Sequence, residues 1–176
     1  MSKKSSIDYV RSMVICAMLT ALSVLLTRFV SPQIGDAMRF SFGTIPIMLS
    51  GILFGPVYGF VVGVAADLVG FLINPMGSSF IIGLTVCSGL LGVVPAVLYN
   101  YVFKIKNTFT LGVSVLTAEL VVSAVLKSAC LMYAFGGTFL TWFMPKLLTA
   151  AVMAVTELIA IGVLLKVLHK AFKKYF

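Results

Sequence analysis

Long apolar segments joined by short connections fill almost the whole chain. In the stretch Arg39 to Pro75, two apolar segments flank the turn Phe54-Gly55-Pro56, and a lone carboxylate, Asp67, lies inside the second segment. Of the 176 residues, 61% are hydrophobic and 10% are charged, proportions unlike those of soluble globular domains. A helix needs about 20 apolar residues to span the hydrocarbon layer. The sequence therefore predicts an integral protein of the lipid bilayer, with residues 1–176 forming a single membrane domain.

The expected fold is all-α, a bundle of six transmembrane helices. The apolar segments and the breakers between them place these helices at Asp8–Val30, Phe42–Phe54, Val57–Ile73, Phe80–Phe103, Phe109–Phe135 and Thr141–His169. The first apolar run is too long for the h-region of a signal peptide, which has about 7 to 15 residues, and is interpreted as an uncleaved helix. The second helix reaches only about 20 Å at about 1.5 Å per residue. Its flanking loop must therefore dip into the bundle, or the lipid must thin around it.

The basic residues indicate an orientation. With six helices, both termini and the second and fourth connections share one side, which collects nine of the thirteen basic residues. These nine are Lys3, Lys4, Arg11, Lys104, Lys106, Lys166, Lys170, Lys173 and Lys174. Because such cations concentrate on the cytoplasmic side of membrane proteins, both termini are predicted to be cytoplasmic. Cations at helix ends and in connections form no nucleic-acid surface, so no nucleic-acid partner is expected.

The other four basic residues fall in the outer half of the predicted bundle, where topology does not explain them: Arg28, Arg39, Lys127 and Lys146. Two anions, Asp36 and Asp67, lie in the same half. An anionic ligand would neutralise the excess positive charge. Alternatively, Asp67 forms a structural ion pair with Lys127 or Lys146, and Arg28 and Arg39 lie at the lipid headgroups.

Helical spacing groups the polar residues of the third and fifth helices. Steps of three and four residues place on one face Gly63, Asp67, Gly70 and Asn74. The same spacing groups Glu119, Ser123 and Lys127. An ionisable residue near the middle of a membrane is a candidate functional group, so Asp67, Asn74 and Lys127 are candidate ligand contacts. Glu119 and Glu157 are interpreted as structural groups or as contacts to a partner.

Aromatic residues gather near the predicted outer helix ends: Phe40, Phe42, Phe71, Tyr133, Phe139 and Trp142. For Tyr133 and Trp142, an interfacial aromatic belt is the simpler interpretation. Together with Asn74 and the nearby cations, Phe42 and Tyr133 would also suit a flat heteroaromatic ligand, which stacks on rings and forms hydrogen bonds at its edges.

Catalytic and metal-binding patterns are missing from the sequence. There is no H-E-x-x-H, no G-x-S-x-G and no G-x-x-x-x-G-K-[ST] phosphate loop. Cys16, Cys87 and Cys130 are widely spaced and are interpreted as buried thiols. We therefore expect no enzyme, no cofactor and no metal, and any active transport must draw its energy from an ion gradient or a partner.

Three motifs carry a resemblance to a known family. They are Arg39–Ile47 (RFSFGTIPI), Gly51–Pro56 (GILFGP) and Asp67–Gly70 (DLVG). In these motifs, and in its length and helix number, the chain resembles the substrate-binding S components of energy-coupling factor (ECF) vitamin transporters, most of all their folate-specific branch. The sharp motifs lie between Arg39 and Gly83.

The resemblance implies a fold, a site and partners. It implies six helices with a vitamin pocket on the extracellular side, gated by the loops between helices 1 and 2 and between helices 3 and 4. It also implies a prokaryotic plasma membrane, a transmembrane coupling subunit bound to two ATPase subunits, and a toppling motion. Ala17 and Ala21 match the Ala-x-x-x-Ala motif that packs against that coupling subunit, and small residues at this spacing permit close helix approach.

The prediction is a folate-binding S component, with Asp67 or Asn74 on the pterin edge and an aromatic ring on its face. The glutamate carboxylates of the ligand would meet some of the four outer cations. The folate branch often has an arginine near the start of helix 6 and a Pro-Gly-Phe-Thr-like run, where this chain has Lys146 and Ile82–Thr85. Pantothenate and riboflavin therefore remain alternative ligands. A solitary ion-coupled carrier using Asp67 or Glu119 is the alternative from another class, and a membrane-embedded enzyme has the least support.

Overall fold

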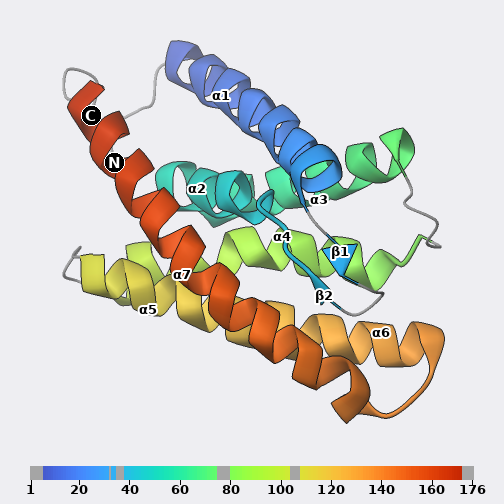
Figure 1. The fold of residues 1–176 in the computed structure, drawn as a ribbon. Coiled ribbons are helices and arrows are strands. Elements are labelled where there is room, and N and C mark those ends of the chain that lie inside the picture. Colours follow the sequence, from blue (N-terminus) through green and yellow to red (C-terminus); the bar gives the residue numbers. More distant parts are fainter. Residues whose placement is uncertain (1–5, 32, 35–37, 75–79, 104–107, 172–176) are drawn as a thin grey trace.

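Helices account for nearly all of the structure, a computed structural model that describes residues 6–31, 33–34, 38–74, 80–103 and 108–171 (Figure 1). The α-helices are α1 (Ser6–Leu25), α2 (Thr44–Phe54), α3 (Pro56–Ile73), α4 (Ile82–Val97), α5 (Thr108–Ala118), α6 (Lys127–Phe135) and α7 (Phe139–Ala171). Three π-helical segments continue α1, α4 and α5 without a break: η1 (Leu26–Val30), η2 (Leu98–Val102) and η3 (Glu119–Leu126). The sequence predicted each of the resulting helical runs to within two residues at either end.

Within the described residues, five helical segments are long and apolar enough to cross a membrane. They are Tyr9–Val30, Pro56–Ile73, Ile82–Val102, Phe109–Phe135 and Phe139–Leu164. The remaining apolar helix, α2, has 11 residues and is the short helix that the sequence predicted. The structure thus confirms a helical protein of membrane-spanning character.

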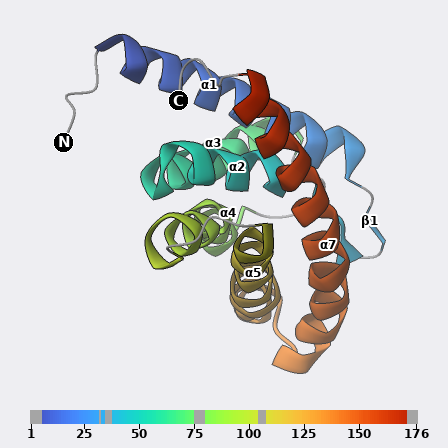
Figure 2. The same ribbon diagram turned by 90° about the vertical axis from the view of Figure 1, so that its left-hand side faces the viewer.

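Successive helical runs point in alternating directions. In Figure 1 the start of α1, the turn between α2 and α3, and the end of α7 lie at the left-hand end of the bundle. The strands, the end of α3 and the end of α6 lie at the right-hand end. Figure 2 shows α1 above α2 and α3, α4 beneath them, and α7 running along one side of the bundle. The basic residues Lys3, Lys4, Lys104, Lys106, Lys173 and Lys174, together with Asp36, lie outside the described residues.

A short pair of antiparallel strands precedes α2, where the sequence predicted only a loop. Strand β1 (Gln33–Ile34) pairs with β2 (Met38–Arg39), with Gln33 opposite Arg39. The two strands are too short to give an alternating pattern that a sequence reading could recognise. Together they bring the chain back toward the start of α2.

Glycine residues allow the backbones of α2, α3 and α4 to touch. A Cβ atom added at Gly59 would lie 2.7 Å from the carbonyl oxygen of Gly92, and one added at Gly92 would lie 2.4 Å from that of Gly59. From α2, Gly51 approaches the same Gly92 carbonyl. Small residues at these positions are what permits such close helix approach.

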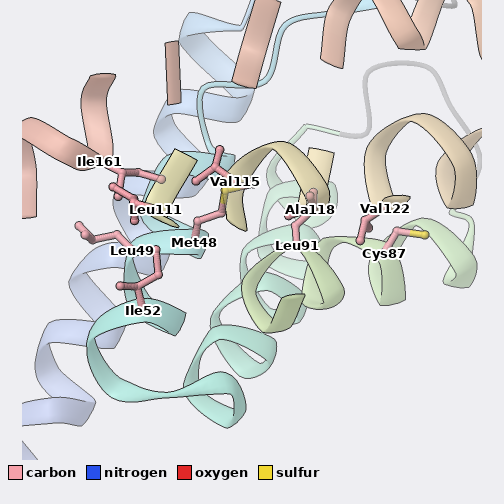
Figure 3. Packing of buried hydrophobic residues seen from close by; sticks show 10 residues of the cluster. All are labelled: Met48, Leu49, Ile52, Cys87, Leu91, Leu111, Val115, Ala118, Val122 and Ile161. Atoms are coloured by element: carbon pink, nitrogen blue, oxygen red, sulfur yellow. The ribbon is translucent and has the colours of Figure 1, made fainter. Parts of the chain in front are cut away.

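The apolar core lies where α2, α4, α5, η3 and α7 meet (Figure 3). Met48, Leu91, Val115, Val122 and Ile161, which come from these five elements, are all fully buried. Two of the elements that meet here, η3 and α7, also carry the buried polar residues Glu119 and Glu157.

Candidate functional site

Polar side chains inside the bundle form two clusters. The Asp67 cluster joins η1, α3 and α4 and consists of Arg28, Asp67, Asn74 and Thr85. The glutamate cluster joins α2, η3, α6 and α7 and consists of Thr44, Glu119, Ser123, Lys127, Lys146 and Glu157. Helix α4 has different neighbours on its two sides. Thr85 bonds to α3, whereas Cys87 lies beside Cys130 of α6.

In the Asp67 cluster, one carboxylate and one guanidinium hold three helical segments together. The hydroxyl of Thr85 donates a hydrogen bond of 2.7 Å to Oδ2 of Asp67. Arg28 attracts the same carboxylate, and its Nη1 donates a bond of 2.7 Å to the backbone carbonyl of Asn74. Asp67 therefore has Arg28 and Thr85 as partners, and the alternative of an ion pair with Lys127 or Lys146 stays a prediction.

Gly70 is the residue that lets Arg28 reach this position. A Cβ atom at Gly70 would lie 2.8 Å from Nε of Arg28. That Nε is buried and has no hydrogen-bond partner among the described residues, because it faces the backbone of α3. The predicted shared face of Asp67, Gly70 and Asn74 is thus confirmed, with Arg28 lying against it.

The glutamate cluster links residues far apart in the chain. Thr44, at the start of α2, shares a hydrogen bond with Oε1 of Glu157 on α7. Glu119 of η3 lies within hydrogen-bonding reach of Ser123 and of Glu157. Lys127 acts electrostatically on both glutamates, since it lies two helical turns beyond Glu119 on the same continuous helical run.

Both glutamates of this cluster are withdrawn from the surface. Glu119 is 2% exposed and Glu157 is 0% exposed. Oε2 of Glu157 has no hydrogen-bond partner among the described residues. An unsatisfied buried acceptor costs about 1–3 kcal/mol, so stability alone does not account for this arrangement. An ionisable residue held at such depth in a membrane protein indicates a functional site.

The glutamate cluster combines two half-buried cations with hydrogen-bond acceptors. Lys146 and Lys127 both act on Glu119, so positive charge and carboxyl oxygens occur close together. This combination suits an organic anion that also carries N–H donors. In the part of the chain that the structure describes, no group of three or more His, Cys, Asp or Glu residues could hold a metal ion.

Two of the three cysteines lie side by side next to this cluster. The Sγ atoms of Cys87 on α4 and Cys130 on α6 are 4.0 Å apart, and both cysteines are free thiols. Lys127 acts electrostatically on Cys87. The third cysteine, Cys16, is buried in a separate group of apolar residues.

The other predicted site residues lie in several places. Phe42 is half-buried, just before α2, whereas Tyr133, near the end of α6, is 93% exposed. Arg39 belongs to β2, but its side chain lies outside the described part of the structure. Ala17 and Ala21 are both exposed on α1.

The sequence interpreted Glu157 as a structural group or a contact to a partner, and its spacing did not indicate the contacts with Thr44 and Glu119. In the structure the strand pair precedes α2, which begins at Thr44, and this first turn meets α7 at Glu157. The spacing of Glu119, Ser123 and Lys127 was the available signal, since it identified one side of the cluster.

Comparisons with known proteins agree with this architecture. The chain matches the family model of the ECF transporter, substrate-specific component, over residues 11–173. It is 30% identical over 145 residues to the "Folate transporter FolT" of Clostridium novyi (strain NT), covering 82% of this chain and 81% of that relative. Its fold matches the crystal structure of a FolT bound with folic acid, with a TM-score of 0.72, 23% identity and 91% of each chain covered.

The family match extends over nearly the whole chain, and the structural match extends over the same helical bundle. Proteins of this family are substrate-binding components of membrane transporters and not enzymes. The resemblance seen in the sequence motifs is therefore confirmed, and the chain belongs to the substrate-specific components of ECF transporters.

Proposed function

We propose that this protein captures folate for an ECF-type importer. The observation that carries the proposal is the 30% identity, over 82% of the chain, to a protein named as a folate transporter. The fold likeness to a FolT bound with folic acid gives further support. The glutamate cluster fits the chemistry, because folate is an anion with a heteroaromatic ring that carries N–H donors.

The proposed site spans both polar clusters. Lys127 and Lys146 attract the glutamate carboxylates of the ligand, and Phe42 stacks on its ring. Arg39 and Tyr133 bind at the entrance. In this proposal Arg28, Asp67 and Asn74 shape the wall near the end of α3. The two lysines support the proposal most directly, since they act on buried acidic groups inside the bundle.

The proposal includes a topology and partners. The chain crosses a prokaryotic plasma membrane six times, with both termini in the cytoplasm. The short helix α2 forms one span, in addition to the five long helical segments. A transmembrane coupling subunit, bound to two ATPase subunits, supplies the energy and contacts α1. The exposure of Ala17 and Ala21 supports this contact, because small residues permit close helix packing. Reactive tags at both termini should be accessible from the cytoplasmic side alone.

Isothermal titration of the detergent-purified protein against a vitamin panel tests the proposal. Folic acid should bind with submicromolar affinity, and pantothenate and riboflavin should not compete. If no folate binds more tightly than micromolar, the ligand assignment is wrong. Uptake into vesicles that lack any ATPase subunit would instead favour an ion-coupled carrier.

A further inference from the structure

We infer that Glu157 is the specificity-determining acceptor of the ligand site, held as a neutral carboxylic acid whose Oε2 accepts an N–H bond from the edge of the ligand's heteroaromatic ring. This inference rests on the proposed function, since it names the group that reads the ring of the bound folate. It assigns Glu157 a part in binding that the sequence alone gave to Asp67 or Asn74.

Counting donors gives the protonation state. The hydroxyl of Thr44 has one hydrogen but two oxygens within reach, the backbone carbonyl of Ser41 at 2.7 Å and Oε1 of Glu157. The carbonyl of Ser41 cannot donate, so it takes the hydroxyl hydrogen. The contact between Thr44 and Glu157 then needs a hydrogen from the carboxyl group. Oε1 of Glu157 carries that proton and donates it to Thr44.

The surroundings favour the same assignment. Glu157 is fully buried, and Glu119 lies within hydrogen-bonding reach of it. Two ionised carboxylates this close would repel each other in a buried setting, which favours at least one proton on the pair. Glu119 is the better-placed anion of the two, because Ser123 and Lys127 both stabilise its charge.

This arrangement leaves Oε2 of Glu157 as a free carbonyl oxygen. It is buried and has no partner among the described residues. A site built to accept a hydrogen bond discriminates strongly against a ligand that lacks the donor, because the buried acceptor stays unpaired. The pterin ring offers an amino group next to a ring N–H, which are donors of the required kind.

Charge counting agrees with an anionic ligand. With Glu157 neutral and Glu119 ionised, Lys127 and Lys146 leave the cluster with one net positive charge. Asp67 is less suited to reading the ring, since Thr85 and Arg28 already occupy it. The neutral acid reads the ring, and the lysines attract the carboxylates.

The test compares two ligands on three proteins. Folic acid and its 2-desamino-2-methyl analogue, which lacks the amino donor, are titrated into wild-type protein, Glu157→Gln and Glu157→Leu. Wild-type protein should prefer folic acid by about tenfold or more. Glu157→Gln, which keeps a carbonyl acceptor and an N–H donor toward Thr44, should retain that preference. Glu157→Leu should lose it, so that both ligands bind about equally.

A ligand fragment and a control variant at the neighbouring residue distinguish a role in ligand binding from a merely structural role of Glu157. Binding of p-aminobenzoylglutamate, which has no pterin ring, should be the same for wild-type protein and Glu157→Leu. The matched control is Thr156→Val, since among the described residues Thr156 bonds to Val152 and Met153 of its own helix; it should keep the wild-type preference. Loss of fragment binding in Glu157→Leu would overturn the inference.

Infrared spectroscopy tests whether Glu157 is protonated, without relying on Glu157→Leu. A stretching band of a protonated carboxyl group should appear in wild-type protein, be missing in Glu157→Gln and shift when folic acid binds. The inference, but not the proposed function, would be overturned by the absence of this band, by the absence of a shift, or by loss of the ligand preference in Glu157→Gln. If wild-type protein binds no folate at all, the proposed function fails as well, so the two failures are distinguishable.

Discussion

Thr44 and Glu157 stand 113 positions apart in the chain and share a hydrogen bond inside the bundle. The contact joins the first turn of α2, which directly follows the strand pair, to the middle of α7. A change in the strand connection can therefore reach the glutamate cluster through the backbone of a single helical turn.

Removing the Lys146 side chain should weaken ligand binding. In Lys146→Ala, we expect the affinity for folic acid to fall by at least about tenfold, because a charge-assisted contact to a carboxylate is lost from a buried site. Isothermal titration measures this change. The matched control is Arg11→Ala, which removes a cation from the opposite end of the bundle and should bind folic acid as the wild type does. Unchanged affinity in Lys146→Ala would remove that residue from the site.

Adding a methyl group between α3 and α4 should destabilise the fold. In Gly92→Ala the new Cβ meets the backbone of Gly59, which cannot rotate away, and overpacking of this kind costs about 1–3 kcal/mol. The thermal unfolding midpoint in detergent should fall. Gly162→Ala is the control, because a Cβ there has nothing within 4 Å; its midpoint should stay the same or rise slightly. Equal midpoints for the two variants would contradict the close helix contact.

Bulky residues on the exposed face of α1 should prevent assembly without affecting capture. Ala17→Leu and Ala21→Leu change exposed positions of α1, and neither alanine belongs to a polar cluster, so folic acid affinity should remain at the wild-type value. Co-purification with the coupling subunit and its ATPases should fall sharply. Ile159→Trp, at an exposed position of α7, should assemble normally. Normal assembly of both alanine variants would place the partner surface elsewhere.

Mild oxidation should join α4 to α6. The Sγ atoms of Cys87 and Cys130 are 4.0 Å apart, and a disulfide of about 2 Å needs only a small shift of the two helices. Diamide should take one hydrogen from each thiol, and mass spectrometry should show the loss of both hydrogens. Cys16→Ser should still form the bond, and Cys87→Ser and Cys130→Ser should not. Retention of both hydrogens in the oxidised wild type would show that the helices cannot approach.

The sequence alone was sufficient to predict where the helices begin and end, because their ends carry strong local signals. Gly55 has a φ of 110° and is followed by Pro56, so α2 and α3 separate at a position readable from the chain. Gly136 and Gly137, with φ values of 75° and 89°, end α6 in the same way. Apolar segments between such breakers form helices whatever their neighbours are.

Sequence alone was not sufficient to assign partners to the polar residues. Helical spacing groups Glu119 with Lys127, but it does not say which helix lies opposite them. Thr85 and Cys87 are two positions apart on α4 and contact different helices. Thr44, the partner of Glu157, lies in the first turn of α2, and the two strands before that helix left no pattern in the sequence.

The backbone contact between Gly59 and Gly92 has a mechanical consequence. With no side chains between these two glycines, α3 and α4 cannot slide past one another at this point without a backbone clash, and α2 meets them at Gly51. These three helices form the frame of the molecule. We therefore expect any movement on ligand arrival to involve α7, which contacts α2 through the side chains of Glu157 and Thr44.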